Sequence, residues 1–191
     1  MSKRSVVLFI AKSLDGYIAD PNGDLTFLSM VERPGEDYGY GEFFASIDTL
    51  VMGRKTYETA LSFPEWPYAG KRVVVMTHQY FESRFGEEFF SGLPSKLVSK
   101  LEAEGAQHLY VDGGAIIRGF LAENLVDELT LSVIPVLLGE GISLFGAEVQ
   151  ETRLVLQSSR SYPKGLVQLR YLAGHFFSSK DKAPYRKSES P

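Results

Sequence analysis

The stretch Thr49-Leu50-Val51-Met52-Gly53-Arg54-Lys55-Thr56 places a short apolar strand directly before the start of a helix. The apolar face of that helix continues with Tyr57, Ala60 and Leu61. A strand that runs straight into a helix is the unit from which parallel sheets with crossover helices are built. This stretch therefore predicts an α/β fold.

The same alternation of strand and helix extends over the first two thirds of the chain. Short apolar runs predict strands at residues 6–11, 49–52, 72–77 and 108–112. Leu97, Val98 and Leu101 form a second apolar helix face, for which Ser95 is the predicted N-cap and Gly105 the stop. A third helix face consists of Ile116, Ile117, Phe120 and Leu121.

The pattern changes after residue 125. A long strand is predicted at residues 129–136, and strands 154–158 and 167–171 flank the turn Tyr162-Pro163-Lys164-Gly165. Consecutive strands joined by a tight turn pair antiparallel. We therefore predict a mostly parallel central sheet that ends in an antiparallel C-terminal hairpin, with ligands bound beyond the carboxyl ends of the parallel strands.

Length and composition exclude several classes of protein. The 191 residues, 44% of them hydrophobic, suit one domain, which we place at residues 1–175, with a mobile polar tail at 176–191. A net charge of −4 without a basic cluster argues against nucleic acid and anionic membranes as partners. Without cysteine and with three histidines, no metal site is expected. The apolar run near the N-terminus is too short for a signal peptide, and no segment is long enough to span a membrane, so a cytoplasmic location is expected.

Three predicted strands end in polar or glycine-rich residues. Gly53, Arg54, Lys55 and Thr56 combine helix amides, a hydroxyl and two cations, which suits a phosphate; a plain tight turn is about as probable. Thr77, His78 and Gln79 suit a ribose phosphate, although a lone polar strand end is commoner. Gly113 and Gly114 would let the backbone approach a pyrophosphate. Together the three strand ends could hold the parts of one dinucleotide.

Further candidates lie in three loops. Asp24 either caps a following helix or points into a cleft, where it would hold the N–C–NH edge of a heterocycle. The loop around Tyr17 and Ile18 is apolar enough to cover a flat ring. The loop around Glu140, with a glycine on each side, could border the substrate or bend the sheet edge.

Motifs of other enzyme classes are missing from the sequence. Gly70-Lys71 is followed by Arg72, so there is no phosphate-binding loop that ends in Gly-Lys-Ser/Thr, and there is no G-x-S-x-G elbow. Gly39-Tyr40-Gly41 lacks a third glycine and a preceding strand. Kinase, hydrolase and Rossmann interpretations therefore lose their main support.

Several motifs, in their order along the chain, resemble the dihydrofolate reductase superfamily. Within it, the chain is most similar to the reductase domain of the bifunctional riboflavin-biosynthesis deaminase/reductase and its stand-alone relatives. The resemblance covers nearly the whole chain up to about residue 175. The motifs are Ser13-Leu14-Asp15-Gly16-Tyr17-Ile18-Ala19, Met52-Gly53-Arg54-Lys55-Thr56-Tyr57-Glu58, Pro67-Tyr68-Ala69-Gly70-Lys71, Val111-Asp112-Gly113-Gly114-Ala115 and Pro135-Val136-Leu137-Leu138-Gly139-Glu140-Gly141-Ile142.

The resemblance implies a three-layer dihydrofolate-reductase-like fold that binds NADPH, and a homodimer, because relatives are often dimers. Arg54 would hold the adenosine 2′-phosphate, and the strand ends and helix starts would hold the rest of the cofactor. The cofactor residues implied are Ala11, Gly53, Arg54, Lys55, Thr56, Thr77, His78, Gln79, Gly113, Gly114, Ala115 and Ile116. It further implies that the Gly113–Gly114 peptide is cis.

On the substrate side, the resemblance implies Asp24 as the catalytic acid and Tyr17, Ile18, Asp112 and Glu140 as substrate-binding residues. Two departures bear on the substrate. Tyr17 stands where dedicated pyrimidine reductases commonly have lysine, and Pro21-Asn22-Gly23 replaces the tryptophan-containing segment of true dihydrofolate reductases. We expect an NADPH-dependent reductase of a small nitrogen heterocycle or its ring-opened sugar derivative. The alternatives are a true dihydrofolate reductase and a non-catalytic NADPH sensor.

Overall fold

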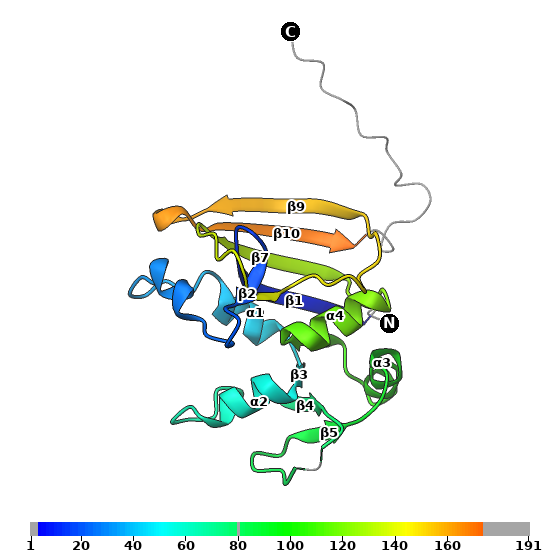
Figure 1. The fold of residues 1–191 in the computed structure, drawn as a ribbon. Helices are drawn as coiled ribbons and strands as arrows, with labels where there is room; N and C mark the ends of the chain where they lie inside the picture. The colour runs from blue at the N-terminus through cyan, green and yellow to red at the C-terminus, as the bar shows by residue number, and fades with distance from the viewer. Residues whose placement is uncertain (1–3, 80, 174–191) are drawn as a thin grey trace.

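The computed structural model describes residues 4–79 and 81–173, so the predicted end of the domain at residue 175 and the tail at 176–191 lie outside the described residues. Strands alternate with helices along much of the chain, which gives an α/β fold around one main sheet (Figure 1). The elements are β1 (Ser5–Ser13), β2 (Tyr17–Ala19), the 3₁₀ helix η1 (Thr26–Met30), α1 (Tyr40–Ser46), β3 (Thr49–Gly53), α2 (Arg54–Leu61), β4 (Arg72–Met76), β5 (Glu88–Phe90), α3 (Pro94–Ala103), β6 (His108–Asp112), α4 (Gly114–Ala122), β7 (Glu128–Ile134), β8 (Ile142–Ser143), β9 (Leu154–Ser161), the 3₁₀ turn η2 (Pro163–Gly165) and β10 (Val167–Ala173).

One eight-stranded sheet organises the fold, in the order β5-β4-β3-β6-β1-β7-β10-β9. The strands from β5 to β7 pair parallel, whereas β10 pairs antiparallel with both β7 and β9. The predicted mostly parallel sheet with an antiparallel C-terminal hairpin is therefore confirmed. The short strands β2 and β8 form a separate antiparallel pair.

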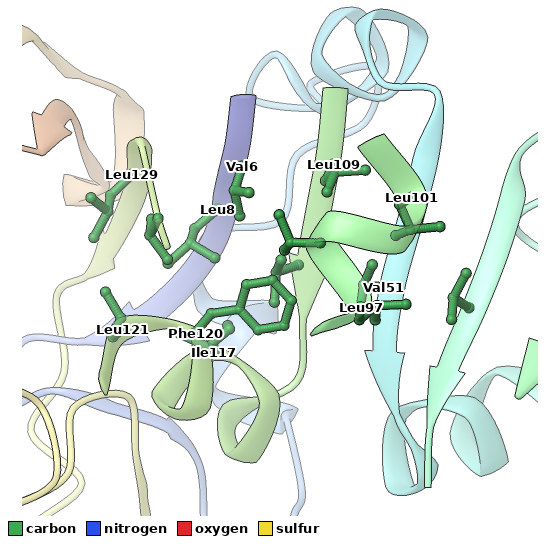
Figure 2. Packing of buried hydrophobic residues seen from close by; sticks show 14 of the residues in the cluster. Val6, Leu8, Val51, Leu97, Leu101, Leu109, Ile117, Phe120, Leu121 and Leu129 are labelled. Atoms are coloured by element: carbon green, nitrogen blue, oxygen red, sulfur yellow. The ribbon is translucent and has the colours of Figure 1, made fainter. Parts of the chain in front are cut away.

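Helices cover both faces of the parallel strands, because side chains on these strands alternate between two apolar clusters. Val6 and Leu8 of β1 and Val51 of β3 pack against α3 and α4, as Figure 2 shows. Leu50 and Met52, the residues on either side of Val51 in β3, face the opposite way. They belong to a cluster with Tyr57 of α2. Burial on both faces explains why these strands read as continuous apolar runs in the sequence.

Helix α3 begins two residues earlier than the sequence predicts. Its N-cap is Leu93, with Pro94 in the first turn, so the predicted N-cap role of Ser95 is wrong. Proline presets the backbone angle of a first helical residue, and this fixes the start of the helix. The Ser95 amide donates instead to Glu123 Oε2 at 3.2 Å. The predicted stop at Gly105 is confirmed, since this residue follows the helix with a φ of 94°.

Candidate functional site

Three polar strand ends meet at one edge of the sheet. Strands β4, β3 and β6 are consecutive neighbours, and Met52 of β3 lies in register with both Val75 of β4 and Asp112 of β6. The residues that follow these strands therefore start from adjacent positions. The structure confirms that the three strand ends singled out in the sequence share one edge.

The N-termini of α2 and α4 lie side by side at this edge. A Cβ atom on Gly113 would lie 2.5 Å from Thr56 Oγ1 and 3.7 Å from the backbone nitrogen of Gly53. Neither helix has a hydrogen bond from a side-chain N-cap. Amides of the first helical turn that lack a cap are donors for an anion, and the helix dipole adds to their attraction. Two such helix starts in contact can hold a pyrophosphate.

The glycines of this edge also serve close packing. A Cβ atom on Gly53 would lie 2.9 Å from Ile116 Cγ1, and one on Gly114 would lie 2.7 Å from Ile18 Cδ1. The second contact places the loop around Ile18 directly over the start of α4. Close packing therefore favours glycine at both positions, whether or not a ligand binds there.

The predicted cis peptide between Gly113 and Gly114 is wrong, because no cis peptide occurs among residues 4–79 and 81–173. Gly113 instead adopts φ 89° and ψ 127°. Such a positive φ is open to glycine and strained for other residues, and it turns the chain from β6 into α4 without the cost of a cis bond, about 2.5–4 kcal/mol.

The cations and polar groups beside the helix starts are exposed. Arg54 Nη1 contacts Glu58 Oε1 at 2.8 Å and Oε2 at 3.1 Å, one turn along α2. Lys55 is exposed without a resolved contact. After β4, Thr77 Oγ1 accepts a hydrogen bond from the Gln79 amide at 3.0 Å, and His78 Nδ1 lies 2.7 Å from Ser91 Oγ.

Asp112 lies at the end of β6, among tyrosines from three other positions in the chain. Its Oδ1 accepts the Gly113 amide at 2.8 Å. Burial raises the pKa of Asp112, which favours the neutral acid, and the Gly113 hydrogen bond opposes this shift only in part. Burial and then the charge of Asp112 raise the pKa of Tyr40 to about 12, and they also raise the pKa values of Tyr68 and Tyr110. The cluster thus combines a carboxyl group that protonates easily with neutral phenols.

A cavity of about 720 Å³ opens on the sheet face that carries η1 and α1. Its floor consists of Phe9 and Ala11 from β1 and Ser132 and Ile134 from β7, and Leu166 also lines it. The segment from Leu28 to Tyr38 forms the opposite wall. Ala11, predicted as a cofactor residue, therefore forms part of the floor of this cavity.

Ser132 provides a polar group in the apolar floor. It is 5% exposed, and its Oγ accepts Gln168 Nε2 at 3.1 Å. Gln168 Nε2 also donates to the Tyr38 carbonyl oxygen at 3.0 Å. Within the described part of the chain the Ser132 hydroxyl donates to no protein group, so its proton is available to a ligand in the cavity.

Tyr40 connects the cavity to the Asp112 cluster. Its ring contacts Phe9 of the cavity floor, with the ring centroids 5.7 Å apart. The same tyrosine is close enough to Asp112 for the carboxylate charge to act on its pKa. The cavity and the glycine-rich strand ends are therefore neighbours in the structure.

Asp24 precedes η1 and is exposed to solvent. Its Oδ1 accepts the Thr26 amide at 2.6 Å, and hydrogen bonds from Thr26 lower its pKa. Asp24 is not among the residues that line the cavity, whereas Leu28 and Ser29 of the same segment are. The N-cap of η1 is Leu25, and no side chain of the described residues caps this helix. The Asp24–Thr26 bond is therefore a local turn contact, and both roles that the sequence allows for Asp24 stay predictions.

The loops of Tyr17 and Glu140 lie next to each other. Tyr17 Oη donates to the Gly139 carbonyl oxygen at 3.3 Å, and Asp15 Oδ2 accepts the Gly139 amide at 2.7 Å. Glu140 itself is exposed. These contacts hold the two loops together beside the start of α4, which Ile18 covers.

Sequence reasoning missed the acidic wall of the cavity, which consists of Glu32, Glu36 and Asp37, and the polar group at Ser132. Residues 31–39 have no regular helix or strand, so no periodic pattern marks them. A signal that could have found them is the density of charged residues around the turn at Pro34-Gly35, directly before the aromatic helix α1.

Comparisons with known proteins agree on one relationship. A model of the RibD C-terminal domain matches residues 4–168. The uncharacterized protein YwjB of Bacillus subtilis (strain 168) is 35% identical over 175 residues, which cover 89% of this chain and 98% of YwjB. A crystal structure of a Shewanella sp. PV-4 protein, named for riboflavin biosynthesis, superposes with a TM-score of 0.82 at 36% identity, over 88% of this chain and 98% of that one.

A more distant structure shares the fold. It is the diaminohydroxyphosphoribosylaminopyrimidine deaminase/5-amino-6-(5-phosphoribosylamino)uracil reductase of Thermotoga maritima, with a TM-score of 0.68 at 16% identity. The match covers 90% of this chain and 57% of that longer chain.

Proposed function

The chain belongs to the RibD C-terminal domain family, which has a dihydrofolate-reductase-like fold, and from this we propose that it is an NADPH-dependent reductase. The proposed substrate is a small pyrimidine- or pterin-like heterocycle or its ring-opened sugar derivative. The observation that carries the proposal is the contact between two uncapped helix N-termini beside a cavity, with the acid Asp112 at the junction.

The residues at the strand edge fit a dinucleotide phosphate. The amides that start α2 and α4, together with the Thr56 hydroxyl, would hold the pyrophosphate. Arg54 and Lys55, with Thr77, His78 and Gln79 after β4, would surround the adenosine 2′-phosphate. Ala11, Ala115 and Ile116 would contact the rest of the cofactor. When bound, NADPH supplies a hydride, and the chain's own residues supply position and protons.

The cavity would hold the substrate ring between Phe9 and the wall from Leu28 to Tyr38. Ser132 can donate a hydrogen bond to a ring nitrogen or carbonyl oxygen. The loops of Tyr17, Ile18 and Glu140 would exclude water from the side that faces α4. A dry site strengthens the interactions that orient the ring.

Asp112 does not line the cavity itself, but it lies at the start of α4 beside the proposed cofactor site, and we propose it as the proton donor. Reduction of a C=N or C=O bond adds a hydride to carbon and a proton to nitrogen or oxygen, so the reaction needs an acid close to the reacting bond. Burial keeps Asp112 protonated more readily than an exposed aspartate. We therefore assign Asp112 to proton delivery, while the predicted catalytic role of Asp24 stays a prediction.

Two substitutions separate these roles. Asp112→Asn is expected to reduce turnover by roughly 10²–10⁴, the usual effect of a positioned acid, and to leave NADPH affinity nearly unchanged. If Asp24 acts on the substrate, Asp24→Asn reduces turnover by a similar factor. Normal turnover of Asp24→Asn would assign this residue to the cap alone, because asparagine caps a helix as well as aspartate does.

The proposed function is tested by NADPH oxidation with a panel of pyrimidines, pterins and phosphoribosylated pyrimidines, alongside titration of NADPH alone. Tight NADPH binding with oxidation by one panel member supports a reductase. Tight binding without oxidation would favour an NADPH sensor, and failure to bind NADPH would reject the proposal. Oxidation by dihydrofolate alone would indicate a true dihydrofolate reductase.

We also propose that the protein is a cytoplasmic homodimer. Strand β9 forms one edge of the sheet (Figure 1). Most of its side chains are exposed. Leu154 and Leu156 of this strand and Val167 of β10 are large apolar side chains that face solvent in the single chain. An exposed edge strand with apolar neighbours is a surface on which a second copy can pair.

A further inference from the structure

We propose that the substrate of this protein carries no phosphate group, so that the cavity takes a neutral or cationic planar heterocycle instead of a phosphoribosylated one. The inference deepens the proposed function and rests on it for the place of the substrate. It depends on the charged side chains at the mouth of the cavity and on the apolar and hydroxyl groups of its floor. All of these residues belong to the part of the chain that the structure describes.

The floor of the cavity accepts a ring and not a charged group. Phe9, Ala11, Ile134 and Leu166 provide apolar surface. Ser132, 5% exposed, offers a neutral hydroxyl donor there. Burying an anion against apolar groups is costly, so a phosphate attached to the ring would have to remain at the mouth.

The mouth is acidic. Glu32, Glu36 and Asp37 line the cavity and are exposed or partly exposed, which places them toward its opening. Arg33 is the one cation among the residues that line the cavity. Lys164 lies near the rim, where its Nζ donates to the Glu32 carbonyl oxygen at 2.6 Å, but it does not line the cavity. Three carboxylates against one guanidinium give the lining an excess of two negative charges.

Two of these carboxylates are held in place by the backbone. Asp37 accepts the amides of Gly39 and Gly41, both at 2.9 Å, and these hydrogen bonds lower the pKa of Asp37. Glu36 Oε1 accepts the Tyr38 amide at 2.9 Å. Because these bonds fix the side chains beside the opening, the carboxylates cannot simply turn away from an incoming phosphate. Like charges at short range would repel it.

The experiment compares two ligands that differ only in the phosphate. The probes are 5-amino-6-(5-phosphoribosylamino)uracil and the riboside obtained from it with a phosphatase. Each is titrated into the wild-type protein with and without NADPH and is assayed for NADPH oxidation. We expect the riboside to bind and to be reduced at least roughly tenfold better, and we expect the difference to shrink at high salt, which screens charge repulsion.

A charge reversal gives the inference a gain-of-function test. The Glu32 carboxylate makes no hydrogen bond within the described residues, so Glu32→Lys should not disturb the fold. We expect this variant to shift the preference toward the phosphorylated probe by roughly tenfold or more. Glu65→Lys is the control, because Glu65 is exposed and does not line the cavity; it should keep the wild-type preference.

The outcomes separate this inference from the proposed function. A preference for the phosphorylated probe, or no change with Glu32→Lys, would overturn the inference while NADPH oxidation still supported a reductase. Binding of the riboside without oxidation would keep the inference and reject the reductase. If neither probe binds, the cavity is not a pyrimidine site and the inference fails.

Discussion

The sequence and the structure suggest different partners for Arg54, a bound phosphate and Glu58 respectively. The sequence places its charge at a helix start, and the structure pairs its guanidinium with Glu58 on the exposed side of α2. An exposed pair at this helical spacing contributes about 0.3–0.5 kcal/mol, whereas a hydrogen bond to a charged phosphate contributes about 1.5–3 kcal/mol. A bound 2′-phosphate would therefore draw Arg54 away from Glu58.

Arg54→Ala is expected to weaken NADPH binding by roughly ten- to a hundredfold, because about 1.4 kcal/mol corresponds to a factor of ten. NADH, which lacks the 2′-phosphate, should bind nearly as before. Calorimetric titration of both dinucleotides measures the difference. Glu58→Gln is the matched control and should leave NADPH affinity equal or slightly higher. Equal losses for both dinucleotides would show that Arg54 supports the fold or the pyrophosphate instead.

Glu87 gives the molecule a specific sensitivity to acid. Its side chain is 4% exposed and accepts hydrogen bonds from the Tyr57 hydroxyl and from the amides of Arg84 and Phe85. Burial alone would raise its pKa, but these hydrogen bonds outweigh burial and lower the pKa to about 2. The folded state therefore holds the ionised form more tightly than the unfolded chain does.

Because the pKa of Glu87 is lowered on folding, its contribution to stability is complete above the unfolded value of 4.5 and is lost as the pH falls from about 5 toward about 2. We expect Glu87→Gln to reduce the free energy of unfolding by about 1–2 kcal/mol at pH 7 and by much less near pH 2. Urea unfolding at both pH values measures this, with the exposed Glu82→Gln as control. A loss independent of pH would show that packing matters and charge does not.

At the scale of the elements, the turn from β6 into α4 depends on Gly113. Its φ of 89° is strained for any other residue, and a Cβ atom would meet Thr56 Oγ1 at 2.5 Å. Gly105 after α3 has a similar φ of 94°, with no atom within 4 Å of its Cβ position. Alanine at Gly105 would add backbone strain alone, whereas alanine at Gly113 would add strain and a clash between the two helix starts. Comparing the two variants therefore separates these effects.

We expect Gly105→Ala to cost about 1–2 kcal/mol from strain alone, and Gly113→Ala to cost more and to abolish NADPH binding. Thermal unfolding gives the stability of each variant, and titration gives its NADPH affinity. If the two variants lose equal stability and both bind NADPH, the close contact between the starts of α2 and α4 is not needed for the site.

The main strands could be predicted to within a few residues, because burial on both faces gives them continuous apolar runs. The predicted strand at 108–112 coincides with β6, whereas the predicted strand at 6–11 falls short of β1 by one residue at its start and two at its end. The short strands β2 and β8 could not be predicted, since they exist only through their mutual pairing. The glycine-rich strand ends were visible as local motifs. The Asp112 cluster was not, because Tyr40, Tyr68 and Tyr110 come together only in the folded chain.

At the scale of the whole molecule, the sheet ends in a hairpin that leaves an apolar edge. Leu156 of β9 is 51% exposed in the single chain. If the proposed homodimer forms over this edge, Leu156→Lys should shift it to monomers, because a buried lysine without a partner is costly. Light scattering over a range of protein concentrations measures the mass. Leu93→Lys, on a leucine before α3 that is 61% exposed, should keep the wild-type state. A wild-type monomer at high concentration would reject the dimer.

No helix among the described residues has the length and apolar character needed to cross a membrane. Several charged side chains form ion pairs, such as those of Arg72 in β4 with Glu88 and Glu104. Exposed ion pairs of this kind contribute little each, so most of the stability comes from the two apolar layers on either side of the sheet.

The position of β1 between β6 and β7 has a consequence for biosynthesis. Its residues leave the ribosome well before both of its partner strands, because Ser5 pairs with His108 and Val7 with Glu128. At about 5–20 residues per second, translation takes roughly 6–25 seconds to proceed from β1 to the end of β7. During that time the apolar strand β1 lacks at least one of its two neighbours, which makes the nascent chain a substrate for chaperones that shield unpaired strands. Slowing translation in the second half of the gene should therefore lengthen this exposure and increase aggregation.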